Sequence, residues 1–108
     1  MSLTVHIYYR GENGAAKRFA EEMTSSGTVA AIRAERGNLQ YEYFYSVEDE
    51  ETVLLVDRWE NQAALDAHHE TQMMRRIMEL REKYDLHMRV ERMLSDETGR
   101  TDGRYVRT

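Results

Sequence analysis

The sequence contains no cysteine and no proline. Without thiols the chain cannot form disulfides, thiolate metal sites or a cysteine nucleophile, and without proline it has no proline-rich linker. It also lacks a run of about 18 apolar residues and an N-terminal signal peptide. With 108 residues, these absences predict a single cytoplasmic domain that does not enter a membrane.

The charge balance is acidic, with 15 Lys and Arg against 20 Asp and Glu, a net charge of −5. This balance argues against binding the phosphate backbone of nucleic acid as the main function. The chain is nevertheless rich in two residue types, with seven Tyr and seven Met among 32% charged residues. We expect these Tyr and Met side chains to lie in the core or to line a binding pocket.

Hydrophobic periodicity divides most of the chain into strands and helices. Alternating apolar and polar residues predict strands at residues 3–10, 39–46, 52–60 and 85–93. Apolar residues at helical spacing predict helices at residues 16–23, 29–36 and 62–84. Asn13, Thr28 and Asn61 are the expected N-caps, and Thr71 is expected to restart the last helix after a kink.

This order is the β-α-β-β-α-β pattern of a ferredoxin-like α+β fold, a four-stranded antiparallel sheet with its helices on one face. The domain is predicted over residues 1–93. Residues 94–108 form a polar tail, whose apolar residues from Ser95 on are Tyr105 and Val106. Alone, this tail is expected to be mobile; these two residues could pin it to a partner subunit.

Apolar side chains are also predicted on the sheet face away from the helices, at Tyr8, Phe44, Leu54 and Val56. Such a face needs a second cover. The simplest cover is another copy of the chain, packed sheet against sheet by two-fold symmetry, which predicts a homodimer. The alternative is that one strand is out of phase.

Trp59 is the only Trp and ends the third predicted strand. His68 follows in the next helix and shares a face with Leu65, which points it toward the sheet. A His beside a Trp between sheet and helix can act as a base near neutral pH. The alternative is a partly buried His with a purely structural role.

Asp57 shares a strand face with Val53 and Leu55, where a carboxylate is unusual. Either it pairs with an arginine such as Arg10 or Arg89, or it is a proton acceptor with a raised pKa. The sequence leaves both interpretations open.

The tyrosine and methionine surplus gathers on two predicted faces. Tyr41, Tyr43 and Tyr45 line one strand, and Met73, Met74 and Met78 lie along one helix. Both groups can wall a pocket for an aromatic ligand, and both can equally be core.

Two further classes of site are disfavoured. His68 and His69 are adjacent on a helix, so their side chains diverge, and no His-Glu-x-x-His spacing occurs; we therefore expect no metal site. Gly11 and Gly14 follow a strand, but the third Gly and the Lys-Ser/Thr ending of phosphate-binding loops are missing.

The segment Asp57-Arg58-Trp59, continued by Ala64-Leu65 and His68, resembles the antibiotic-biosynthesis monooxygenase family. That family typically has an acidic residue, one spacer and Trp, then Ala-Leu and His in the following helix. Residues 33–41 also resemble its segment leading into the second strand. Arg36 stands where Pro often precedes the Gly, and residues 48–50 lack the usual Asp-Pro. The resemblance covers residues 5–93.

The resemblance implies a dimeric ferredoxin-like barrel and a monooxygenase without metal, flavin or other cofactor, acting on a quinol or a polyphenolic aromatic. In such chemistry the deprotonated substrate itself reduces oxygen. On this reading His68 would be the base and Asp57 would orient or share the proton. The small aromatic substrate would lie against Trp59, Tyr9, Tyr41, Tyr43, Met74 and Met78.

The resemblance leaves other functions open. Haem-degrading relatives carry Trp at the position of His68 and His at that of Met78, and neither matches. A small-molecule-binding or regulatory dimer without turnover is one alternative. Another is an isomerase of a small carbonyl or phosphosugar substrate, for which Arg10 and Arg89 would be the cationic residues.

Overall fold

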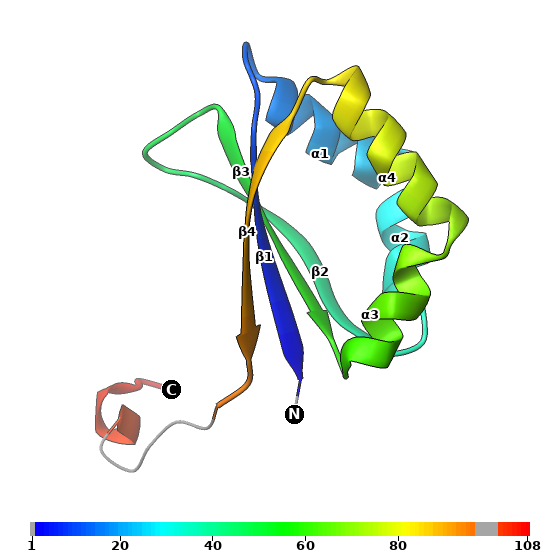
Figure 1. The fold of residues 1–108 in the computed structure, drawn as a ribbon. Coiled ribbons are helices and arrows are strands. Elements are labelled where there is room, and N and C mark those ends of the chain that lie inside the picture. Colours follow the sequence, from blue (N-terminus) through cyan, green and yellow to red (C-terminus); the bar gives the residue numbers. More distant parts are fainter. Residues whose placement is uncertain (1, 97–101) are drawn as a thin grey trace.

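The computed structural model describes residues 2–96 and 102–108. The chain forms a four-stranded antiparallel sheet in the order β2-β3-β1-β4, with the α-helices on one side (Figure 1). This arrangement confirms the predicted ferredoxin-like α+β fold. The elements in chain order are β1 (Leu3–Arg10), α1 (Ala15–Ser25), α2 (Thr28–Arg33), β2 (Asn38–Tyr45), β3 (Thr52–Trp59), α3 (Gln62–His69), α4 (Gln72–Lys83), β4 (His87–Leu94) and the short 3₁₀ helix η1 (Asp102–Tyr105).

The core lies between the two central strands and the helices. Tyr9 of β1 is opposite Val53 of β3, and Ile7 is opposite Leu55, so their side chains share the face that the helices cover. All four are buried. The predicted phases of both strands are therefore correct, because alternation assigns every second residue to this face.

The opposite face of the sheet is apolar in its middle and partly exposed. Tyr8 and Phe44 lie on either side of Leu54 in the register of the sheet, and Phe44 is 41% exposed. The apolar pattern predicted for both faces of the central strands is thus present.

The two caps of the second helical region are as predicted. Asn61 accepts a hydrogen bond from the backbone N–H of Ala64 at 2.9 Å and starts α3. Thr71 accepts one from the N–H of Met74 at 3.3 Å and starts α4 after the break. The caps fix where His68 stands relative to the end of β3.

The two caps predicted for the first helical region are wrong. Gly14 and Gly27, which have no side chain, occupy the N-cap positions of α1 and α2, with φ of 77° and 82°. These left-handed conformations favour glycine, so Asn13 lies before the cap and Thr28 inside the helix.

Helix α2 ends at Arg33, three residues earlier than the predicted 36. The chain then turns through residues 34–37 into β2. Gly37 has a φ of +87°, and a Cβ there would lie 2.6 Å from the Cβ of Ala64. The glycine thus lets this turn approach the start of α3 closely.

The predicted tail lies partly outside the described residues, which omit 97–101. Tyr105 and Val106 are 85% and 59% exposed. In the described part of the chain, no helix is long and apolar enough to cross a membrane.

Candidate functional site

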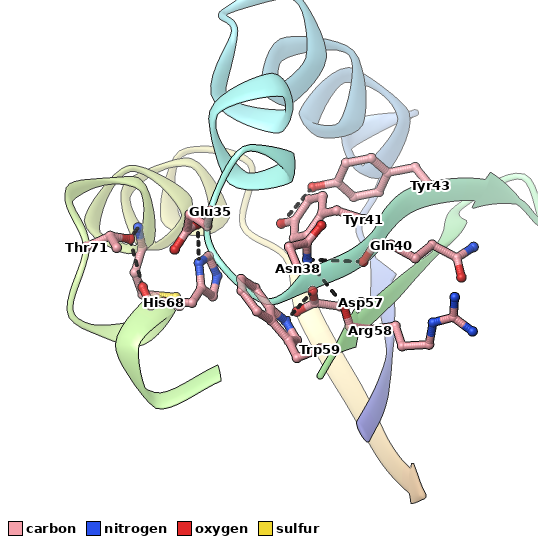
Figure 2. A network of polar contacts seen from close by, with 11 residues as sticks. Glu35, Asn38, Gln40, Tyr41, Tyr43, Asp57, Arg58, Trp59, His68 and Thr71 are labelled. Atoms are coloured by element: carbon pink, nitrogen blue, oxygen red, sulfur yellow. Dashed lines mark hydrogen bonds and ion pairs between the residues drawn. The ribbon is translucent and has the colours of Figure 1, made fainter. Parts of the chain in front are cut away.

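The candidate site lies in the core, where the end of β3 faces α3 (Figure 2). Trp59, His68 and Asp57 are 0%, 3% and 4% exposed. His68 and Leu65 are the buried residues of α3, as their spacing predicted, whereas His69 is exposed. The end of β3 and the following helix α3 thus bring together the carboxylate of Asp57, the indole of Trp59 and the imidazole of His68.

Asp57 accepts a hydrogen bond from Nε1–H of Trp59 at 2.7 Å. Burial, aided by the nearby charge of Glu35, raises the pKa of Asp57 to about 7, although the Trp59 hydrogen bond and Arg81 act in the opposite direction. A buried carboxyl group with this pKa can hold or release a proton near neutral pH.

The predicted pairing of Asp57 with Arg10 or Arg89 is wrong. Arg10 contacts Asp49 at 3.3 Å, and the guanidinium of Arg89 lies 3.9 Å from the ring centroid of Tyr8. Both arginines are on the sheet face away from the helices because they share the strand phase of Tyr8. Neither of the two cationic residues named for the isomerase alternative therefore lies beside Asp57 and His68.

His68 is held from two sides. Its ring lies on that of Trp59, with centroids 4.8 Å apart and planes inclined by 31°. Its Nδ1 is 2.8 Å from Oε2 of Glu35, which is itself 13% exposed. Burial lowers the pKa of the imidazole, and the hydrogen bond and charge of Glu35 oppose that shift.

Glu35 was missed by the sequence analysis. The periodicity placed it inside a helix, whereas it lies in the turn between α2 and β2. It is 33 residues from His68 in the chain, and no local pattern signals such a contact. A carboxylate shortly before a turn glycine is not distinctive by itself.

Three predicted tyrosines lie near this cluster. The hydroxyl groups of Tyr41 and Tyr43 are 3.5 Å apart, and the Tyr41 ring is 6.5 Å from that of His68. The hydroxyl of Tyr9 accepts hydrogen bonds from Arg81 at 2.9 and 3.2 Å. Burial raises the pKa of all three tyrosines, so their hydroxyl groups stay protonated near neutral pH.

The two methionines of the predicted pocket are placed differently. Met74 is half-buried and packs against the core. Met78 is 58% exposed, so the prediction that it shares one helix face with Met73 and Met74 is wrong. It follows Ile77, which is buried, and one residue turns the helix by about 100°, away from the core.

Two of the larger cavities lie apart from His68. One of about 510 Å³ lies between α1 and β2 and is lined by Tyr43, Arg33 and neighbouring residues. Another of about 480 Å³ lies on the opposite face of the sheet, beside Phe44 and Leu54. Within residues 2–96 and 102–108, no group of three or more His, Asp or Glu side chains is placed to hold a metal ion.

The fold and this cluster define a ferredoxin-like domain with a buried His–Glu pair beside a Trp–Asp pair. The family model described as antibiotic biosynthesis monooxygenase matches residues 2–80. The chain belongs to this family. A similar protein of Bacillus subtilis (strain 168) carries the name "Putative monooxygenase YcnE"; it is 44% identical over 69 residues, which are 64% of this chain and 70% of that protein.

Solved structures show the same fold. PA3566 from Pseudomonas aeruginosa superposes with a TM-score of 0.76 at 25% identity, over 89% of this chain and 95% of the other. A mutant of SnoaB, described as a cofactor-independent oxygenase from Streptomyces nogalater, gives 0.75 at 9% identity, over 90% and 95%. At such low identity the likeness to SnoaB concerns the fold alone.

Proposed function

We propose that the protein is a monooxygenase that uses no metal or flavin and oxidises a quinol or polyphenolic aromatic with O2. The observation that carries the proposal is the buried imidazole of His68, tied through Nδ1 to Glu35 and stacked on Trp59. An imidazole oriented in this way has one nitrogen left for a substrate proton. Membership of the family supports the reaction class.

In the proposed reaction, His68 removes a proton from a substrate hydroxyl group. The resulting phenolate is electron-rich and transfers electrons to O2, and a C–O bond forms at a ring carbon. Loss of the hydrogen of that carbon and cleavage of the O–O bond release water, and the substrate, which supplies all four electrons, leaves as a hydroxyquinone. The protein contributes a base, orientation and exclusion of water. Asp57 would orient or share the proton, and the rings of Trp59 and Tyr41 would face the substrate.

The aromatic substrate would bind between the sheet and the helices. Because His68 is only 3% exposed, a ring can reach it only if neighbouring side chains move. Met74 is well suited to this, since it is half-buried at the edge of the core and its unbranched side chain adapts readily. Of the hydroxyl groups of Tyr41 and Tyr43, which contact each other, the one that accepts would keep its own hydrogen for a substrate oxygen.

Oxygen uptake with a panel of hydroquinones tests the proposal. We expect uptake above the autoxidation rate in metal-free protein, and a loss of about 10²-fold or more in His68→Ala, since a positioned base contributes roughly 10²–10⁴-fold. His87→Ala is the matched control, because His87 is exposed at the start of β4. Binding of hydroquinones without oxygen uptake would instead support the non-catalytic binding protein.

We also propose that two copies of the chain pair through the sheet face opposite the helices. Tyr8, Phe44, Leu54 and Val56 would be covered there, together with the cavity of about 480 Å³. An exposed apolar face of this kind is a usual site of association. The pairing would close a barrel from the two sheets.

A further inference from the structure

We propose that Glu35 is the positioning residue of this site: its carboxylate holds the proton of His68 on Nδ1 and so makes Nε2 the atom that accepts the substrate proton. The inference rests on the proposed function in one respect, that His68 is the base. The tautomer of His68 is independent of any turnover.

Glu35 is rigidly placed by its own backbone. Its N–H donates to the carbonyl of Ile32 at 3.0 Å, and its carbonyl accepts from the N–H of Asn38 at 3.2 Å. The same turn is fixed on α3 by Gly37, which lies against Ala64. The backbone of Glu35 is therefore fixed, and its carboxylate reaches His68 from a turn that is held independently of that contact.

His68 is held as firmly from its own side. Its backbone carbonyl accepts a hydrogen bond from Oγ1 of Thr71 at 2.7 Å, which fixes the end of α3. The stack on Trp59 fixes the plane of the ring, and Trp59 is in turn held by Asp57. Figure 2 shows the imidazole between the carboxylate of Glu35 and the indole.

The contact with Glu35 decides which ring nitrogen of His68 carries the proton. An ionised carboxylate only accepts hydrogen bonds, so a contact of 2.8 Å between Nδ1 of His68 and an ionised Glu35 places the hydrogen on Nδ1. In the neutral imidazole the other nitrogen is then an acceptor. Among the residues that the structure describes, every fully buried side-chain nitrogen or oxygen has a hydrogen-bond partner. Among those residues Nε2 of His68 makes no hydrogen bond, so its lone pair is available to a substrate proton once a substrate reaches the ring.

Charged and titratable groups from three elements face the ring. Glu35 faces it from the turn before β2, His69 from α3 and Arg81 from α4; the last two favour the neutral imidazole, and Glu35 favours the imidazolium. Asp57 lies on the far side of Trp59, to which it is hydrogen-bonded, and the ring of Tyr41 lies beside the ring of His68. Since burial also favours the neutral ring, the charge of Glu35 is what stabilises the imidazolium that proton uptake creates.

Nitrogen-15 NMR of His68 tests the tautomer on the whole protein without substrate. When the imidazole of His68 in the wild-type protein is neutral, we expect a protonated Nδ1 and an unprotonated Nε2. Glu35→Gln keeps the shape but removes the charge, so the population with the proton on Nε2 should rise and the pKa of His68 should fall. The matched control is Glu82→Gln, on the exposed side of α4, which should match the wild type.

Oxygen uptake by the same variants tests the catalytic role of the contact. We expect kcat to fall about 10-fold or more in Glu35→Gln, with a shifted pH profile and little change in KM. Glu35→Asp keeps the charge and should recover part of the rate. A structural role alone would lower stability in all variants and leave the pH profile unmoved.

The outcomes separate the two proposals. The inference is overturned if wild-type His68 carries its proton on Nε2, a measurement that needs no variant and so decides even if Glu35→Gln fails to fold. It is also overturned if the tautomer and the pKa of His68 are unchanged in Glu35→Gln. The predicted tautomer without oxygen uptake for any hydroquinone leaves Glu35 as the residue that positions His68 and overturns the monooxygenase proposal instead.

Discussion

At the scale of single residues, the core contains two titratable polar side chains. Asp57 and His68 are buried, and burying such groups costs free energy unless they are hydrogen-bonded. Each has one strong partner, Trp59 and Glu35 respectively. The partners lower the cost of burial without removing it, as the raised pKa of Asp57 shows.

This raised pKa predicts a pH-dependent stability. The pKa of Asp57 is about 7 in the folded chain, against an ordinary value of 3.8. Between about pH 4 and 7 the unfolded chain therefore loses this proton while the folded chain keeps it, so ionisation favours unfolding as pH rises. Asp57→Asn cannot ionise, and its amide oxygen can still accept from Trp59. Relative to this variant, the wild type should lose roughly 2 to 4 kcal/mol of stability over that interval.

Urea denaturation of both proteins at several pH values measures this difference. Asp85→Asn is the control, because its side chain is 95% exposed; its stability should follow that of the wild type. Parallel curves for wild type and Asp57→Asn would show that the carboxyl group is ionised in the folded chain at pH 4 and above.

At the scale of elements, the site depends on how one turn meets one helix. The turn of residues 34–37 carries Glu35, and Gly37 lets it touch Ala64 at the start of α3. The backbone carbonyl of Gly37 also accepts a hydrogen bond from the N–H of Glu60 at 2.8 Å. These contacts set the distance across which Glu35 reaches His68.

We therefore expect Gly37→Ala to destabilise the fold more than Gly27→Ala. Both positions have a positive φ, which costs a non-glycine residue about 1–2 kcal/mol, but a Cβ at Gly27 has nothing within 4 Å, whereas one at Gly37 meets Ala64 at 2.6 Å. Overpacking of this kind costs roughly a further 1–3 kcal/mol. Thermal or urea denaturation compares the two variants.

The double variant Gly37→Ala with Ala64→Gly separates the two costs. It removes the methyl group that the new Cβ meets, so the part of the destabilisation due to crowding should be recovered. Equal losses in Gly37→Ala and Gly27→Ala would mean that the turn and α3 are further apart in solution.

At the scale of the whole molecule, the sheet is covered on one face only (Figure 1). Leu54 at the centre of the other face is half-buried, and Phe44 beside it is 41% exposed. This face is mixed rather than purely apolar, since Arg89 lies over Tyr8 at its β4 side. A polar edge around an apolar centre is typical of protein–protein interfaces.

The proposed dimer predicts a particle of twice the 12.8 kDa chain mass at micromolar concentration. Leu54→Glu would bury a charge at the interface and should weaken association by about 10-fold or more. Met78→Glu is the control, since Met78 is exposed on the helical side. Sedimentation or light scattering gives the mass; a wild-type protein at the mass of one chain would contradict the proposal.

The sequence by itself determined the strands, the phases of the two central strands and the ferredoxin-like order, because alternation and helical spacing are local and β1 and β3 each bury one clear face. It also placed Asp57, Trp59 and His68 together, since β3, the Asn61 cap and the first turns of α3 follow one another in the chain. Locally encoded caps at Asn61 and Thr71 were correct for the same reason.

Only the tertiary structure decided what these residues contact. Glu35 meets His68 across 33 residues, and Arg81 of α4 meets Tyr9 across 72; neither contact has a local signal. The early end of α2, the surface position of Met78 and the separation of Asp57 from Arg10 and Arg89 were likewise settled by packing. Side-chain partners depend on which faces meet in space, and periodicity reports only which face a residue is on.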